Sequence, residues 1–163
     1  MKIIIAILAI FIISFGCIGP ETATNNDFTL LKEQYNVTDT FYPDLDIMNS
    51  YITDLSLLRS KSNLTLSRVI DVELYSAQSF YYFSKSLEES NQINYGSDLC
   101  NSKSYKNTLM YLDFSKNYSQ KANSALTQVL PTDVYLLKTN QSEVINNFYN
   151  LANEYKLTLE ELC

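Results

Sequence analysis

The side chains that could perform catalysis are carboxylates with no histidine beside them. The chain has 18 Asp and Glu residues and no histidine, which excludes Ser-His-Asp and Cys-His catalysis and histidine-ligated zinc or iron sites. Paired carboxylates can hydrolyse glycosides. The closely spaced pairs are Asp71/Glu73, Glu88/Glu89 and Glu160/Glu161. Glu73 lies next to an expected apolar stripe, so we favour a structural partner, a tyrosine hydroxyl or a lysine, over catalysis.

No motif indicates a cofactor or a metal. The sequence lacks a glycine-rich phosphate loop and the CxxC, GxSxG and HExxH motifs. Two cysteines without histidine fall short of the four ligands that a zinc site needs. We therefore expect neither an enzyme nor a bound cofactor.

Tyrosine is the most unusual feature of the composition, with 13 Tyr and 8 Phe but no Trp. A tyrosine combines a flat apolar face with a hydroxyl, so a row of them can line a groove for a ligand or form a protein interface. Most of the tyrosines coincide with expected core stripes, and we favour packing for those. Tyr82 is the best candidate for a surface aromatic, because Phe80, Tyr81 and Phe83 cannot all share one helix face with it.

The charge of the chain bears on its partners. A formal net charge of −6 argues against binding to a nucleic-acid backbone, which needs a basic surface. The lysines that give one later segment a basic bias are Lys103, Lys106, Lys116 and Lys121. Such a run is typical of a solvated face, with contact to an acidic wall polymer or lipid headgroups as the alternative.

Four Asn-x-Ser/Thr sequons occur, at Asn36, Asn63, Asn117 and Asn140. Their number is close to what chance gives in a chain this rich in Asn, Ser and Thr. Asn36 and Asn140 fall at expected loop or cap positions, which makes them the favoured glycosylation acceptors if the chain is exported.

The first twenty residues have the layout of an export signal. Met1-Lys2 is followed by an unbroken apolar run from Ile3 to Ile13 and then by Ser-Phe-Gly-Cys, which ends at Cys17. A basic start, a short apolar run and a small residue are typical of a signal peptide. A membrane-spanning helix needs about 20 apolar residues.

The cysteine directly after Gly16 resembles the lipobox of lipoproteins, and the Gly16-Cys17-Ile18-Gly19 context is similar to that of archaeal surface lipoproteins. The resemblance covers the leader alone. It implies cleavage before Cys17 and attachment of a lipid to its thiol. An uncleaved, tilted anchor from Ile3 to about Gly19 and simple secretion are the alternatives. All three place the rest of the chain outside the cytoplasm.

The remaining chain predicts an all-α fold. Glycine is scarce, and Pro43, Gly96 and Pro131 divide the chain into segments of helical length. We expect helices from about 44 to 60, 64 to 91, 101 to 130 and 141 to the C-terminus, arranged as an antiparallel up-down four-helix bundle. The domains are then 1–16, a signal peptide or anchor; 17–42, a lipid-anchored polar tether in which a short helix can form around Phe28 and dock on the domain; and 43–163, the bundle.

Apolar residues at three- and four-residue spacing predict the core face of each helix. For the third helix the expected stripe consists of Tyr111, Phe114, Tyr118, Ala122, Ala125 and Val129. For the fourth helix it consists of Val144, Phe148, Leu151, Tyr155 and Leu162. Asn140 and Glu143 approximate a capping box at the start of the fourth helix.

The bundle brings two cysteines together. If Cys17 is lipidated, Cys100 and Cys163 remain, an even number in an oxidising compartment. Cys100 begins the third helix and Cys163 ends the fourth, so antiparallel packing places both at one end of the bundle. We predict a disulfide between them; two free thiols or an intermolecular bridge are the alternatives.

These features predict a membrane-anchored lipoprotein on the extracellular face of the cell membrane. Its expected role is to bind or scaffold a protein or envelope partner. The alternative is a ligand-binding module with a tyrosine-lined groove between helices, for solute capture or sensing. The sequence leaves the oligomeric state open.

Overall fold

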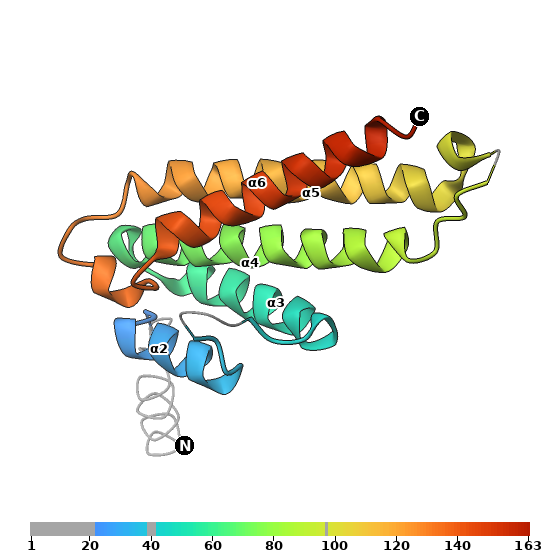
Figure 1. Cartoon of the computed structure of the whole chain (residues 1–163). Coiled ribbons are helices and arrows are strands. Elements are labelled where there is room, and N and C mark those ends of the chain that lie inside the picture. Colours follow the sequence, from blue (N-terminus) through green and yellow to red (C-terminus); the bar gives the residue numbers. More distant parts are fainter. Residues whose placement is uncertain (1–21, 39–41, 97) are drawn as a thin grey trace, which may run out of the picture.

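The computed structural model describes residues 22–38, 42–96 and 98–163, and these form five α-helices packed together (Figure 1). The helices are α2 (Asn25–Gln34), α3 (Leu45–Lys61), α4 (Leu64–Ser90), α5 (Lys103–Leu126) and α6 (Gln141–Glu160), with short 3-10 helices η1 (Leu99–Asn101) and η2 (Val134–Leu136). The predicted all-helical class is confirmed. Pro43, Gly96 and Pro131 all lie between helices, where a missing amide hydrogen or a missing side chain costs least.

The three longest helices form the body of the molecule. In Figure 1, α4 and α5 run side by side in opposite directions, and α6 crosses over α5 on the way back. Helix α3 packs on α4, and α2 packs on α3. The side of the molecule that carries α2 and α3 is therefore thicker than the opposite end.

Helix α2 belongs to the folded domain. Thr24 and Asp27 form a reciprocal capping box at its start, and the Phe28 side chain is completely buried. The Ala23 amide donates to the Lys61 carbonyl oxygen at 3.0 Å, which ties the chain to the end of α3. The short helix expected around Phe28 is confirmed, and it docks on the domain as anticipated, so residues 22–38 belong to the fold and do not act as a free tether. The signal segment and Cys17 lie outside the described residues.

The core has two parts. The larger part joins α2, α3, the first half of α4, the end of α5, η2 and the start of α6. Its largest buried side chains include Tyr51, Phe28, Met48, Leu55 and Ile70. The smaller part lies between the other ends of α4, α5 and α6. Its buried members are Ile93, Leu99, Tyr105, Leu112, Ala152 and Leu159. We call these two parts of the molecule the α2 end and the disulfide end.

The buried stripe of α5 differs from the predicted one. The residues buried along this helix are Tyr105, Thr108, Leu112, Ser115, Ser119, Ala122 and Ala125. Tyr111 and Tyr118 are half-buried, and Phe114 is exposed. The prediction is confirmed for Ala122 and Ala125 and wrong for the three aromatics. Ser115 and Ser119 are buried at that level of the helix instead, and apolar periodicity does not detect such small hydroxyl residues.

Serines fill the contact between α4 and α5. The Ser79 Oγ lies 2.7 Å from the Ser119 Oγ and donates to the Ser115 carbonyl oxygen at 3.0 Å, and the Ser115 Oγ donates to the Ser79 carbonyl oxygen at 2.9 Å. All three residues are buried. Small side chains let the two backbones approach closely, and these bonds satisfy hydroxyls that would otherwise be costly to bury.

The buried stripe of α6 is also shifted from the prediction. Gln141, Ile145, Ala152 and Leu159 are buried. Leu151 and Leu162, expected in the core, are 48% and 52% exposed. The other predicted residues, Val144, Phe148 and Tyr155, are half-buried, and Phe148 and Tyr155 pack against the core, so the predicted stripe lies along the edge of the observed one.

The predicted link between Cys100 and Cys163 is present, with the two sulfurs at disulfide distance, 2.15 Å, and the Cα atoms 5.7 Å apart. Cys100 lies in η1, directly before α5, and Cys163 follows α6. The bond therefore closes the hairpin of α5 and α6 at the disulfide end, as antiparallel packing requires.

Candidate binding surface

A row of aromatic side chains lies along the contact between α4 and α5 on its solvent side. We call it the aromatic strip; its members are Tyr75 and Tyr82 from α4 and Tyr111, Phe114 and Tyr118 from α5. The seven-residue step on α4 is two helical turns, and the α5 residues are three and four apart, so each helix presents its members on one face. All five keep solvent access, and Phe114 is 38% exposed.

Tyr82 is the centre of the strip. Its ring centroid lies 5.5 Å from that of Tyr118, with the planes 4° apart, and 6.1 Å from that of Tyr111. The Phe114 ring contacts Tyr82 at 5.1 Å, and Tyr75 stacks on Tyr118 at 6.3 Å. The rings thus alternate between the two helices. The strip holds the outer side of the α4–α5 pair together while the serines hold the inner side.

The strip is uncharged but has a cation beside it. Burial, followed by the neighbouring tyrosines, of which Tyr118 contributes most, raises the pKa of the Tyr82 hydroxyl, so this group stays neutral and able to donate near pH 7. The Lys121 ammonium lies 4.7 Å from the centroid of the Tyr118 ring, within the range of a cation–π contact. Tyr82 is therefore a surface aromatic, as predicted, although it is half-buried among other rings.

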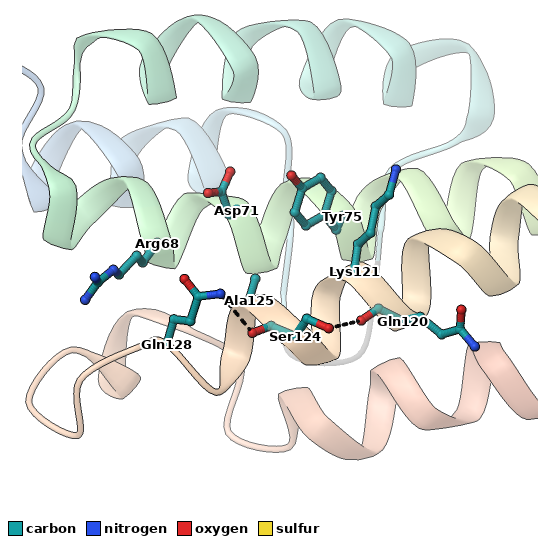
Figure 2. Close-up of a pocket in the computed structure, with 8 residues that line it drawn as sticks. All are labelled: Arg68, Asp71, Tyr75, Gln120, Lys121, Ser124, Ala125 and Gln128. Carbon is teal, nitrogen blue, oxygen red and sulfur yellow. Dashed lines mark hydrogen bonds between the residues drawn. The ribbon is translucent and has the colours of Figure 1, made fainter.

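A hollow of about 350 Å³ adjoins the strip toward the α2 end (Figure 2). The residues that line it are Arg68, Asp71, Tyr75, Gln120, Lys121, Ser124, Ala125 and Gln128. Asp71 is already paired with Arg59 of α3. The lining offers both donors and acceptors of hydrogen bonds next to a tyrosine ring.

The carboxylates of Asp71 and Glu73 lie in different surroundings and bond to different partners. Asp71 faces the outside of α4, where Arg59 binds it. Glu73 is completely buried, and its Oε1 accepts a hydrogen bond from the Tyr51 hydroxyl at 3.0 Å. The sequence favoured a tyrosine or a lysine as the partner of Glu73, and the partner is the tyrosine Tyr51.

Several buried polar side chains surround Glu73, and most of these neighbours could not be predicted from the local sequence. The Gln141 Nε2 of α6 donates to the Ser76 Oγ at 2.9 Å. The Tyr42 hydroxyl lies close to Glu73, Gln141 and Ser76, and burial is the main reason why its pKa is raised well above 10. Neither the Glu73 Oε2 nor the Tyr42 hydroxyl has a well-aligned bond to another described residue. These groups come from four separate segments, so only the fold brings them together.

The lysines of α5 are mostly solvated, as favoured from the sequence: Lys103, Lys106 and Lys121 are exposed, and Lys116 is half-buried. Two of them also contact neighbours. Lys116 donates to the Asn153 Oδ1 of α6 at 2.7 Å, whereas Lys121 lies over Tyr118 on the strip side.

Both favoured sequon residues are accessible. Asn36 is exposed and adopts a left-handed backbone with φ of 52°. Asn140 is exposed and makes no side-chain cap bond, so the predicted capping box with Glu143 is absent. The Asn63 side chain instead caps α4 by accepting from the Leu66 amide at 2.9 Å, a role that the sequence analysis missed.

Neither a group of metal ligands nor a helix that could span a membrane is present among the described residues. No set of three or more His, Cys, Asp or Glu side chains within residues 22–38, 42–96 and 98–163 could hold a metal ion. Across those same ranges, every helix is too short or too polar to cross a membrane.

No protein-family model matches the chain, and no curated protein or solved structure is significantly similar to it.

Proposed function

We propose that this protein is a membrane-anchored lipoprotein on the extracellular face of the cell membrane that binds a protein or envelope partner through the aromatic strip. Its framework is an up-down four-helix bundle of α3 to α6 with α2 docked on it, and its anchor is Cys17. No catalytic role is included, because the chain has no histidine and its only deeply buried candidate carboxylate, Glu73, bonds to a tyrosine.

The observation that carries the proposal is the solvent access of the strip. Five aromatic side chains remain half-buried or exposed along one line. Three of them, Tyr111, Phe114 and Tyr118, were expected in the core, where Ser115 and Ser119 are buried in their place. Aromatic residues are enriched in the centres of protein interfaces. The tyrosine hydroxyls add hydrogen-bonding groups to a surface that is otherwise apolar.

The test is site-specific photo-crosslinking on intact cells that express the full chain. A photoreactive amino acid placed at Phe114 is expected to give a discrete adduct with one partner. The Tyr82→Ala variant should reduce that adduct at least several-fold, because it removes the central ring of the strip.

The matched control is Tyr149→Ala, which removes a half-buried tyrosine of α6 outside the strip. It should leave the adduct unchanged. Equal adducts in both variants would overturn the strip as the binding surface, provided that circular dichroism shows both variants to be folded.

The second candidate is a ligand-binding module. The hollow beside Tyr75 favours it, since planar polar side chains and an aromatic ring together suit a small polar ligand. It ranks second because the lining is mainly polar and charged, whereas small-molecule sites are mostly apolar. Mass spectrometry of material that co-purifies with the native protein, compared with an Arg68→Ala/Gln120→Ala variant, would distinguish the two.

The anchor is tested separately by mass spectrometry of protein extracted from membranes. A mature chain that begins at Cys17 and carries a lipid supports the lipoprotein proposal. An intact chain from Met1 would instead support an uncleaved anchor.

A further inference from the structure

The α2 end exposes large apolar side chains close to where the N-terminal segment joins the domain. Tyr135 of η2 is 71% exposed and Leu64, the first residue of α4, is 70% exposed, while Leu57 of α3 and Leu30 of α2 are 55% and 52% exposed. The disulfide end also has exposed apolar residues, among them Tyr95 at 63%. Exposure alone therefore does not distinguish the two ends.

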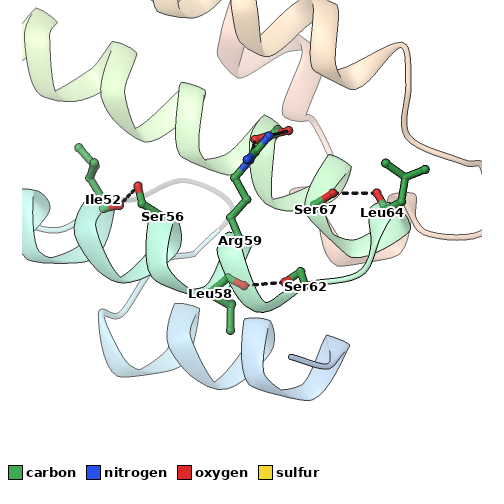
Figure 3. A network of polar contacts seen from close by, with 8 residues as sticks. Ile52, Ser56, Leu58, Arg59, Ser62, Leu64 and Ser67 are labelled. Atoms are coloured by element: carbon green, nitrogen blue, oxygen red, sulfur yellow. Dashed lines mark hydrogen bonds and ion pairs between the residues drawn. The ribbon is translucent and has the colours of Figure 1, made fainter. Parts of the chain in front are cut away.

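Hydrogen bonds between α2, η2 and the end of α3 show that these exposed residues lie at the same end of the molecule. The Asn25 Nδ2 of α2 donates to the Tyr135 hydroxyl at 3.2 Å, and the Ala23 amide bonds to the Lys61 carbonyl oxygen beside the α3–α4 turn. Figure 3 shows this turn, with α2 lying along α3 and Leu64 at the start of α4. A hollow of about 260 Å³ between α2 and α3 has an apolar floor of Leu30, Leu31, Leu57 and Leu58.

Covalent connection distinguishes the two ends. Four residues lie between Cys17 and Thr22, the first described residue, and the five steps from one to the other span at most about 17 Å even when fully extended. If the chain is anchored at or before Cys17, Thr22 and the α2 that follows must stay close to the lipid. The disulfide end is farther away by the length of α4, whose 27 residues measure about 40 Å.

We propose that the α2 end docks on the bilayer and that Leu57, Leu64 and Tyr135 enter the boundary between headgroups and acyl chains. The inference rests on the proposed membrane anchoring and adds an orientation to it. A tyrosine suits this depth because its ring is apolar and its hydroxyl remains wet.

Apolar contact, not charge, drives this docking. The polar residues around the hollow carry both signs, with Asp27 and Asp54 opposite Lys61, so they give no net attraction to anionic lipid. Docking is therefore expected on uncharged phosphatidylcholine, with little dependence on salt. The aromatic strip then extends from the membrane outward along α4 and α5, where a partner can reach it.

The experiment uses the absence of tryptophan from the chain. The full chain is reconstituted in phosphatidylcholine vesicles as two single-tryptophan variants, Tyr135→Trp at the α2 end and Tyr95→Trp at the disulfide end. Both replace an exposed tyrosine by a slightly larger ring. Lipids brominated on the acyl chains are expected to reduce the fluorescence of the Tyr135→Trp variant by about half and to leave that of the Tyr95→Trp variant unchanged.

Vesicle flotation distinguishes the possible failures. If both variants float and are quenched equally, or neither is quenched, the anchor stands and the docking proposal is overturned. If neither floats, anchoring and docking are both overturned. Leu64→Trp provides a second reporter at the α2 end if Tyr135→Trp disturbs folding. Adding Leu57→Ser to the Tyr135→Trp or the Leu64→Trp variant should at least halve the quenching.

Discussion

The two ends of this molecule are stabilised in different ways. The α2 end combines α2, α3, η2 and parts of α4, α5 and α6 around a large core, with Tyr51, Glu73, Ser76 and Gln141 bonded inside it. The disulfide end has three helices, a small core and a covalent link between Cys100 and Cys163.

The difference illustrates how the available burial decides the means of stabilisation. Where α2 and α3 add layers, enough apolar surface is buried to offset the cost of enclosing a carboxylate and several hydroxyls. At the disulfide end those layers are missing, so the small core contributes less to the free energy of unfolding. The disulfide compensates for this because it restricts the unfolded chain.

The largest predicted effect is the loss of the disulfide. A Cys100→Ser/Cys163→Ser variant should lower the free energy of unfolding by about 4 kcal/mol, because a loop of this length is strongly restricted by its crosslink in the unfolded state. Urea denaturation measures the loss. Amide exchange should accelerate first at the ends of α5 and α6 near the bond. Faster exchange at the α2 end instead would contradict the division into two independently stabilised ends.

The next effect is at Tyr51. Tyr51→Phe removes the donor to the buried Glu73 Oε1 and should cost about 1–3 kcal/mol, the penalty for an unsatisfied buried polar group. Tyr35→Phe is the matched control, since Tyr35 also bonds a carboxylate, Asp54, at 2.6 Å, but in a half-buried place that water can reach. Equal losses in the two variants would show that burial does not strengthen the Tyr51 bond.

Alkaline pH should weaken the α2 end. Burial raises the pKa values of Tyr42 and Tyr51 well above 10, and the charge of Glu73 acts in the same direction. A tyrosine with a raised pKa in the folded state contributes stability that is present below about pH 10 and is lost as the pH rises toward the folded value. The free energy of unfolding should therefore fall above about pH 10, and less steeply in Tyr51→Phe. An unchanged slope in that variant would argue against this account.

The smallest effect concerns helix caps. Asn63→Ala removes the bond from the Leu66 amide and should cost about 1 kcal/mol, whereas Asn140→Ala should cost much less because Asn140 makes no such bond. Thermal unfolding of both variants measures the difference. A larger loss for Asn140→Ala would mean that its side chain caps α6 in solution.

The sequence predicted the helices better than it predicted their faces. Pro43, Gly96 and Pro131 marked the breaks correctly, because they act through local backbone geometry. The core face predicted for α5 was right for Ala122 and Ala125 but wrong in the middle of the helix, because Ser115 and Ser119 are small polar residues whose burial depends on Ser79 of another helix. The same pairing explains why Tyr111 and Tyr118 lie at the surface although they are large and partly apolar.

The candidate binding surface was only partly predictable. Tyr82 was named because four consecutive aromatics cannot share one helix face, but all four residues from Phe80 to Phe83 are half-buried, and it is the contacts with Tyr111 and Tyr118 that place Tyr82 in the strip. Its neighbours Tyr118 and Phe114 could not be assigned, since the angle at which α5 packs on α4 decides which residues meet. Cys100 and Cys163 were an easier case, because antiparallel order alone places them together.

By itself the sequence determined the helical class, the positions of the breaks, the cysteine pair and the chemistry that a chain without histidine lacks. These follow from residue type and short spacing. The tertiary structure alone decided that serines pack between α4 and α5, that the aromatic strip stays at the surface, and that Glu73 meets Tyr51. Each of these depends on close packing between separate segments, where the size and hydrogen bonding of one side chain select its neighbour.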